Sequence, residues 1–187
     1  MIITGSDKGE MVALKNRLFR DFEMKDLGEL KYFLGIEVLR SERGIFISQR
    51  KYILDLLAET GLMDCKPADT PMVVNHGLQI KEGAAPANQG QYQRLVGKLI
   101  YLSYTRPDIA YAVGVISQFM HKPQTDHMEA ALRIVRYLKK SPNRGVFFQK
   151  NGHLEIQVYT DADWAGNPND RKSTSWYFTL VGGNLVT

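Results

Sequence analysis

The hydrophobic positions follow a helical repeat in the middle of the chain and a strand repeat towards both ends. Apolar residues recur every three or four positions in five segments, which predict helices over 7–22, 49–60, 91–104, 107–120 and 125–140. Alternating or clustered aromatic and branched residues predict strands over 2–4, 31–39, 45–48, 145–150, 154–160, 174–181 and 184–187. Asn151-Gly152 is typical of a two-residue turn, so we expect strands 145–150 and 154–160 to form a hairpin. The pattern predicts an α+β fold.

Residues 62–90 interrupt this pattern with prolines, glycines and few large apolar side chains. They predict a linker or a long loop. Because so long a connection is unusual inside a compact domain, it suggests a boundary or a solvent-exposed crossing. We expect the helical middle, roughly 49–140, to be the best-formed part of the chain.

The composition is that of a folded, reduced protein. Of the 187 residues, 44% are hydrophobic and 24% charged, which argues against wholesale disorder. The single cysteine, Cys65, excludes a disulfide framework and a multi-cysteine zinc site within this chain. No apolar stretch approaches the ~20 residues of a membrane span, and the first ten residues do not resemble a signal peptide. We therefore expect a soluble intracellular protein, cytoplasmic or nuclear, with no membrane partner.

The positive charge is concentrated in one stretch. The formal net charge is +4, whereas residues 120–150 alone carry seven basic and two acidic side chains. Arg133, Arg136 and Lys140 share one flank of the predicted helix 125–140. Such a face attracts polyanions through counterion release, but it is equally typical of a solvated helix face.

Two carboxylates follow the apolar strand 154–160. Asp161 and Asp163 are two residues apart, so on a strand they project to the same face and can approach one divalent cation. Mg²⁺ accepts a few carboxylates and otherwise keeps water or phosphate oxygens, so further ligands must come from elsewhere in the fold. A solvated pair of loop carboxylates explains the motif as well.

A second group mixes cations with aromatic residues. Arg94, Lys98 and Arg106 lie near Tyr101 and Tyr104. This combination suits nucleic-acid backbones and bases. It also suits amphipathic helices that cover a core with long side chains, so both interpretations stay open.

Several motifs, in a fixed order, resemble the Pol polyproteins of copia-type LTR retrotransposons. Residues 31–38 resemble the last palm strands of their reverse transcriptase, and Phe33-Leu34-Gly35 resembles its primer grip, a tight hairpin. Similarity to the thumb and connection covers 65–67, 70–71, 92–97, 105–109 and 111–113. Residues 159–166 and 171–175 resemble the start of the family's ribonuclease H domain.

The resemblance implies three parts: the palm end with the hairpin over 1–48, a helical thumb and connection over 49–144, and incomplete ribonuclease H strands over 145–187. The family uses Mg²⁺, and Asp161 corresponds to its first metal-binding, catalytic aspartate, with Asp163 beside it. The paired polymerase aspartates would precede Ile2, so we expect the polymerase centre to be missing. Trp176 departs from the family's usual glycine, and we expect it to strain local packing or to expose apolar surface.

The leading hypothesis is a catalytically inactive fragment of such a polyprotein that binds an RNA–DNA hybrid or another duplex in a salt-dependent way, with no tightly bound cofactor. Other parts of the polyprotein are further expected partners. The nucleic-acid-binding residues expected from motif and charge are Phe33, Leu34, Gly35, Arg94, Lys98, Arg106, Arg133, Arg136 and Lys140. The alternative is a magnesium-dependent nuclease that uses Asp161 and Asp163. A metal-dependent sugar-nucleotide transferase would also use an Asp-Ala-Asp motif, but nothing upstream in this sequence resembles the nucleotide-binding α/β unit that such an enzyme needs. A non-catalytic product of a decayed element is a further hypothesis, and it is compatible with the leading one.

Overall fold

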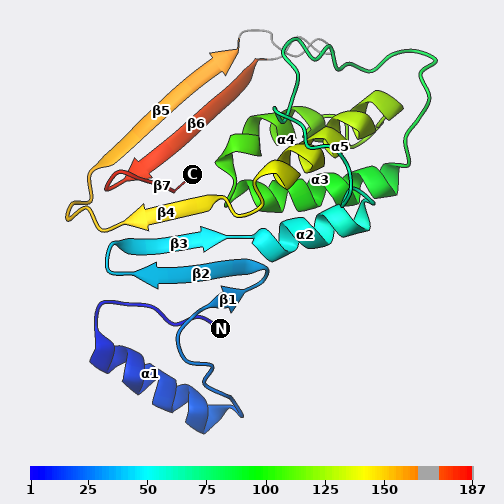
Figure 1. Ribbon diagram of the computed structural model, residues 1–187. Coiled ribbons are helices and arrows are strands. Elements are labelled where there is room, and N and C mark those ends of the chain that lie inside the picture. Colours follow the sequence, from blue (N-terminus) through cyan, green and yellow to red (C-terminus); the bar gives the residue numbers. More distant parts are fainter. Residues whose placement is uncertain (164–172, 187) are drawn as a thin grey trace.

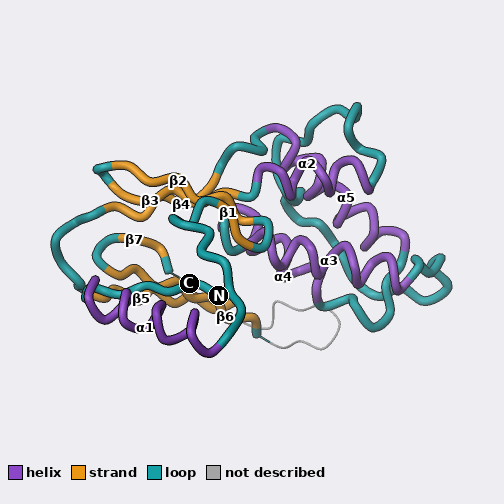
Figure 2. The backbone as a smooth tube through the Cα atoms, turned by 90° about the horizontal axis from the view of Figure 1, so that it is seen from below, coloured by secondary structure: helices purple, strands orange, loops and turns teal. Residues whose placement is uncertain are grey.

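The structure is a computed structural model that describes residues 1–163 and 173–186, with only the backbone of Asp163 and Thr174. Four helices form a compact body, and two antiparallel sheets extend from one end of it (Figure 1). Figure 2 shows the strands of both sheets on one side and helices α2–α5 on the other. The fold is therefore mixed α and β, as predicted.

The helical body contains almost all of the hydrophobic core. Its helices are α2 (Arg50–Glu59), α3 (Gln89–Ser103), α4 (Ala110–Ser117) with the preceding 3₁₀ turn η1 (Pro107–Ile109), and α5 (Thr125–Lys140). The apolar stripe of α5 is fully buried and comprises Ala131, Ile134, Val135 and Leu138. Burial of each large aliphatic side chain contributes about 1.5–3 kcal/mol. In the described part of the chain, no helix is long and apolar enough to cross a bilayer.

Helix α1 (Lys8–Asp21) is separate from this core. Its first turn is capped by Asp7, whose Oδ1 accepts a hydrogen bond from Glu10 N at 3.0 Å. None of its residues is buried, and the helix lies beyond the sheet, far from α2–α5 (Figure 1). The predicted strand at 2–4 is wrong: these residues pair with no strand.

The first sheet has the order β1-β2-β3-β4, with all neighbours antiparallel. Its strands are β1 (Tyr32–Phe33), β2 (Ile36–Ser41), β3 (Gly44–Ser48) and β4 (Gly145–Gln149). The single strand predicted over 31–39 is interrupted by a turn, and β3, the strand predicted over 45–48, pairs with β2 as a hairpin.

The predicted hairpin between strands 145–150 and 154–160 is wrong. Both strands exist, but β4 pairs with β3, from Gly44↔Gln149 to Ser48↔Gly145, and β5 (Ile156–Asp163) pairs with β6 (Thr174–Val181). The free edge of β3 offers β4 a five-residue ladder, so a tertiary contact overrides the turn propensity of Asn151-Gly152. A second sheet of order β5-β6-β7 is completed by β7 (Asn184–Leu185). The loop expected over 165–172 lies outside the described residues.

Residues 62–88 contain no helix or ladder strand, as predicted, but this loop packs along α5. Ala68 N donates to Arg136 O at 3.3 Å, and Thr125 N donates to Ala85 O at 3.1 Å. Gln124 Nε2 donates to Lys81 O at 2.6 Å, and Lys81 N donates back to Gln124 Oε1 at 3.0 Å. The 62–88 loop thus covers one side of the helical body.

The second sheet, β5-β6-β7, contacts the rest of the molecule next to β4 and next to α4. Near its base, Asn184 exchanges hydrogen bonds with the backbone of Gln149 at 2.6 and 3.0 Å. Further along, the half-buried Trp176 packs against Tyr111, with ring centroids 5.3 Å apart, and over Gly114, where a Cβ atom would lie 2.4 Å from the indole. The bulky side chain that departs from the family pattern therefore fits against α4, although its Nε1 is buried without a partner in the described part of the chain.

Candidate nucleic-acid interface

A two-residue turn joins β1 to β2. Phe33 pairs with Ile36, and the two residues between them both have positive φ, 49° at Leu34 and 89° at Gly35. Positive φ at both central positions defines a type I′ hairpin turn, which Gly35 adopts freely and a leucine adopts at a cost. The tight hairpin that the Phe33-Leu34-Gly35 motif implied is therefore present.

Two tyrosines from the helical body hold this turn. Tyr101 on α3 donates its hydroxyl hydrogen to Leu34 O at 2.6 Å. Tyr52 on α2 packs beneath Gly35, where a Cβ atom would lie 3.2 Å from its ring. The two rings meet edge to face with centroids 5.5 Å apart, and burial raises the pKa of Tyr52. The turn is fixed by contacts with two helices as well as by its ladder.

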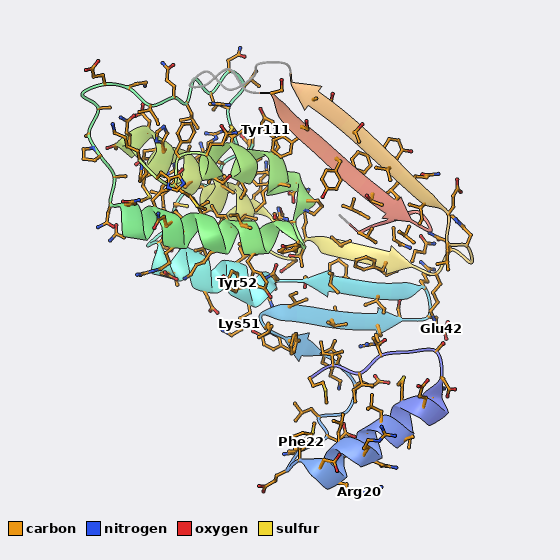
Figure 3. The ribbon with its side chains drawn as sticks, turned by 180° about the vertical axis from the view of Figure 1, so that it is seen from behind. Arg20, Phe22, Glu42, Lys51, Tyr52 and Tyr111 are labelled. Atoms are coloured by element: carbon orange, nitrogen blue, oxygen red, sulfur yellow. The ribbon has the colours of Figure 1, made fainter. Side chains whose placement is uncertain are left out.

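Apolar side chains are exposed around the turn. Tyr32 is 54% exposed, Leu34 71% and Tyr104 72%. Tyr104 meets Tyr101 with centroids 6.4 Å apart, so the exposed ring continues the aromatic group that holds the turn. Figure 3 shows Lys51 and Tyr52 at the start of α2, next to the strands. An exposed aromatic surface on a fixed scaffold is suited to stacking against bases.

The cations of α3 form a row that leads towards the turn. Arg94, Lys98 and Tyr101 are spaced four and three residues apart and so share one face of the helix. Lys98 forms an ion pair with Glu59, and Arg94 is exposed and has no ion pair in the described part of the chain. Of the three cations expected beside Tyr101 and Tyr104, Arg94 and Lys98 share a face of α3 with Tyr101, whereas Arg106 lies elsewhere.

The basic flank of α5 faces the 62–88 loop. Lys140 pairs with Asp69 at 2.6 Å, and Lys139 Nζ donates to Cys65 O at 2.5 Å. Arg133 donates to Thr70 Oγ1 at 3.0 Å. The charges that we expected to contact a duplex are thus also used within the chain, although Lys140 keeps 55% of its side chain exposed.

The structure contradicts the prediction that Arg106 contacts nucleic acid. Its side chain is 1% exposed, and its guanidinium donates two hydrogen bonds to Asp108, at 2.9 and 2.7 Å, and one to Ser141 O at 2.9 Å. Burial alone would raise the pKa of Asp108, but the bonds from Arg106 and from the Tyr137 hydroxyl lower it below its ordinary value. Arg106 ties the start of α4 to the end of α5 and cannot reach a phosphate in this conformation.

The candidate metal site is incomplete. Asp161 is exposed, lies opposite Trp176 in the β5–β6 ladder, and accepts a hydrogen bond from Ala162 N at 2.9 Å. Within residues 1–163 and 173–186, no group of three acidic, histidine or cysteine side chains is close enough to hold a metal ion. The side chain of Asp163 and all of Asp170 lie outside the described part. The family that the sequence resembles uses Mg²⁺, but the donors described here do not complete a site for it.

Sequence reasoning missed how Tyr52 contributes to the interface. Its position in an apolar helical repeat marks it only as a core residue, and nothing local links it to Gly35 or to Tyr101. The burial of Arg106 was also missed. The only local sign of this burial is the order Arg106-Pro107-Asp108. At the start of a helix, an arginine two residues before an aspartate can pair with that aspartate.

Comparison with known proteins identifies the family of the chain. Residues 1–74 match the family model of reverse transcriptases, the RNA-dependent DNA polymerases. The whole chain is 44% and 41% identical to the retrovirus-related Pol polyproteins of transposons RE1 and RE2 of Arabidopsis thaliana. It is 36% identical to an uncharacterized mitochondrial protein of the same plant, of which it covers 78%. The chain belongs to the family of copia-type retrotransposon Pol polyproteins.

The chain is similar to only a short part of its long relatives. It spans 13% of the length of the RE1 and RE2 polyproteins and 15% of the Pol polyprotein of transposon TNT 1-94 from Nicotiana tabacum, to which it is 37% identical. No solved structure matches it. The chain thus corresponds to a segment of these polyproteins, and its residues 1–74 to part of the reverse transcriptase domain.

Proposed function

We propose that this segment binds a primer–template duplex, an RNA–DNA hybrid above all, and that the surface around the β1–β2 turn makes the contact. The observation that carries the proposal is the turn itself. Leu34 adopts a left-handed conformation that costs a leucine about 1–2 kcal/mol, and its side chain is 71% exposed. Strain of this kind at an exposed, well-supported position is typical of functional sites.

The surroundings of the turn supply both parts of a non-specific nucleic-acid surface. Tyr32 and Tyr104 offer exposed rings for stacking, and Arg94 offers a positive charge on the α3 row that no described residue pairs. The Tyr101 hydroxyl holds the turn at a fixed height above α3, so the rings and the charge keep their relative positions. In this proposal the basic flank of α5, with Lys140, adds long-range attraction, and the contact is independent of sequence.

In the same proposal, the segment binds and the chemistry belongs to other parts of the polyprotein. Asp161 with Asp163 as a magnesium-dependent nuclease remains the alternative. Hydrolysis of an RNA–DNA hybrid by the purified chain in Mg²⁺, lost on Asp161→Asn, would replace the first proposal by the second.

Fluorescence anisotropy with a labelled RNA–DNA hybrid tests the binding. We expect an affinity that falls linearly with the logarithm of salt concentration, and a loss of about fivefold or more in Tyr104→Ala because one stacking contact is removed. Tyr177→Ala is the matched control, since Tyr177 is similarly exposed, at 67%, on the distant β6 strand. The proposal fails if the folded chain does not bind at low salt, or if the two variants lose affinity equally.

A further inference from the structure

A cavity of about 350 Å³ lies between α5 and residues 71–81 of the 62–88 loop. Met72, Leu78 and Ala130 line the apolar side of this cavity, and charged side chains, most of them on α5, line the other side. This volume and this mixture are typical of small-molecule sites, where apolar walls hold the body of a ligand and a few polar groups fix its orientation.

The charges that line the cavity do not cancel. Lys81 pairs with Asp126 at 2.7 Å, and Arg136 lies 3.6 Å from Glu129. Arg133 is the remaining cation of the lining, and it makes no ion pair with any residue that the structure describes. One positive charge is therefore left without a counter-charge in a partly enclosed space.

The guanidinium of Arg133 is held but not saturated. One terminal nitrogen donates to Thr70 Oγ1 at 3.0 Å, which fixes the side chain against the loop. Its Nε atom is buried and has no hydrogen-bond partner in the described part of the chain. Its charge also helps to lower the pKa of Asp69, but the hydrogen bond from Lys140 is the larger cause, and that carboxylate is bound to Lys140. The buried Nε is closed to a ligand, but the two terminal nitrogens keep N–H donors beyond the one used by Thr70, and such a pair suits a phosphate, which can accept two parallel hydrogen bonds.

We propose that this cavity binds a small phosphate monoester of nucleotide size, with its phosphate on Arg133 and its less polar body against Met72 and Leu78. His76 also lines the cavity, and its Nδ1 accepts a hydrogen bond from Leu78 N at 3.1 Å, which fixes the orientation of its ring. The monoester can be a free nucleotide or the phosphorylated 5′ end of a strand, since both carry the same group. The cavity is separate from the β1–β2 turn, so this proposal does not depend on duplex binding at the turn.

Titration of the whole ¹⁵N-labelled chain with adenosine 5′-monophosphate, adenosine and a 5′-phosphorylated or 5′-hydroxyl dinucleotide tests the proposal. We expect the monophosphate to bind at least about tenfold more tightly than adenosine, and Arg133→Gln to remove that advantage. Arg17→Gln, which removes an exposed arginine of α1 outside the cavity and outside the β1–β2 turn surface, is the matched control and should leave the affinity unchanged. Amide shifts should centre on residues 71–81 and the first half of α5. A preference for the phosphorylated dinucleotide over the monophosphate would identify a strand end as the ligand.

A second variant covers the case in which Arg133→Gln does not fold. Ala130→Leu keeps every charge but adds bulk to the cavity wall, and it should weaken binding of the monophosphate at least about tenfold. Equal affinity for the monophosphate and adenosine, shifts centred elsewhere, or no binding at about 10 mM ligand would overturn the proposal. Duplex binding by the same preparation separates this result from that of the β1–β2 turn.

Discussion

Leu34→Asn tests whether the β1–β2 turn stores conformational strain. Leu34 lies at φ 49° and is followed by Gly35 at φ 89°. Asparagine tolerates the left-handed region far better than leucine, and Asn-Gly is the preferred pair in a type I′ turn. The substitution therefore keeps the backbone geometry while removing its cost.

The expected size follows from two opposing contributions. Relief of the left-handed leucine stabilises the folded state by about 1–2 kcal/mol. Leu34 is 71% exposed, so loss of its remaining buried surface costs well under the ~2 kcal/mol of a fully buried leucine. The free energy of unfolding should therefore rise by about 0.5–1 kcal/mol.

Urea denaturation followed by circular dichroism measures this change. Leu27→Asn is the matched control, because Leu27 is 86% exposed and does not have positive φ, and it should change stability by less than about 0.5 kcal/mol. A decrease of stability in Leu34→Asn would refute the strain argument. If the proposed interface is also correct, the stabilised variant binds the RNA–DNA hybrid more weakly, so stability and affinity move in opposite directions.

Three further perturbations address the packing that supports the site. Asp108→Asn should lower the free energy of unfolding by about 3–5 kcal/mol, measured by urea denaturation, because the buried Arg106 loses its carboxylate; a cost under 1 kcal/mol would show that Arg106 reaches solvent. Burial lowers the pKa of His127 below 6.5, so stability should be complete above that pH and be lost as pH falls towards the folded value, a dependence that His127→Gln removes in pH-dependent melting. Gly114→Ala should destabilise the chain in thermal melts, since its Cβ would meet Trp176, yet should stabilise it by up to about 1 kcal/mol in a Trp176→Ala background, where only helix propensity is left. The same sign in both backgrounds would refute that contact.

Local patterns predicted the helices well. The boundaries 125–140 of α5 agree with the sequence because an amphipathic stripe, polar residues before its first turn and lysines in its last turn all lie within the helix itself. The cap at Asp7 and the end of α2 before Gly61, with φ 68°, were predictable for the same reason. Each of these features depends on residues only a few positions apart.

Features that depend on distant partners were not predictable. The Asn151-Gly152 dipeptide suggested a local hairpin, but β4 finds a better partner in β3. Composition alone could show that residues 62–88 form a loop, but not that they bind the cations of α5. Likewise, no local pattern places Tyr52 and Tyr101 against one turn, because these residues come from two helices and meet only in the folded core.

The pairing of β3 with β4 has a consequence for how the chain acquires its structure during synthesis. Ser48 leaves the ribosome about a hundred residues before its partner Gly145, so the edge of β3 has no partner while the helical body is being made. The helices α2–α5 must pack first, because they bring β4 back to that edge and so shorten a costly loop closure. Expression of a chain that stops after α5 would leave this edge exposed, a state that invites strand addition from neighbouring molecules. β4 is therefore the last strand to join the first sheet, and its pairing with β3 covers the edge of the hairpin next to the proposed nucleic-acid surface.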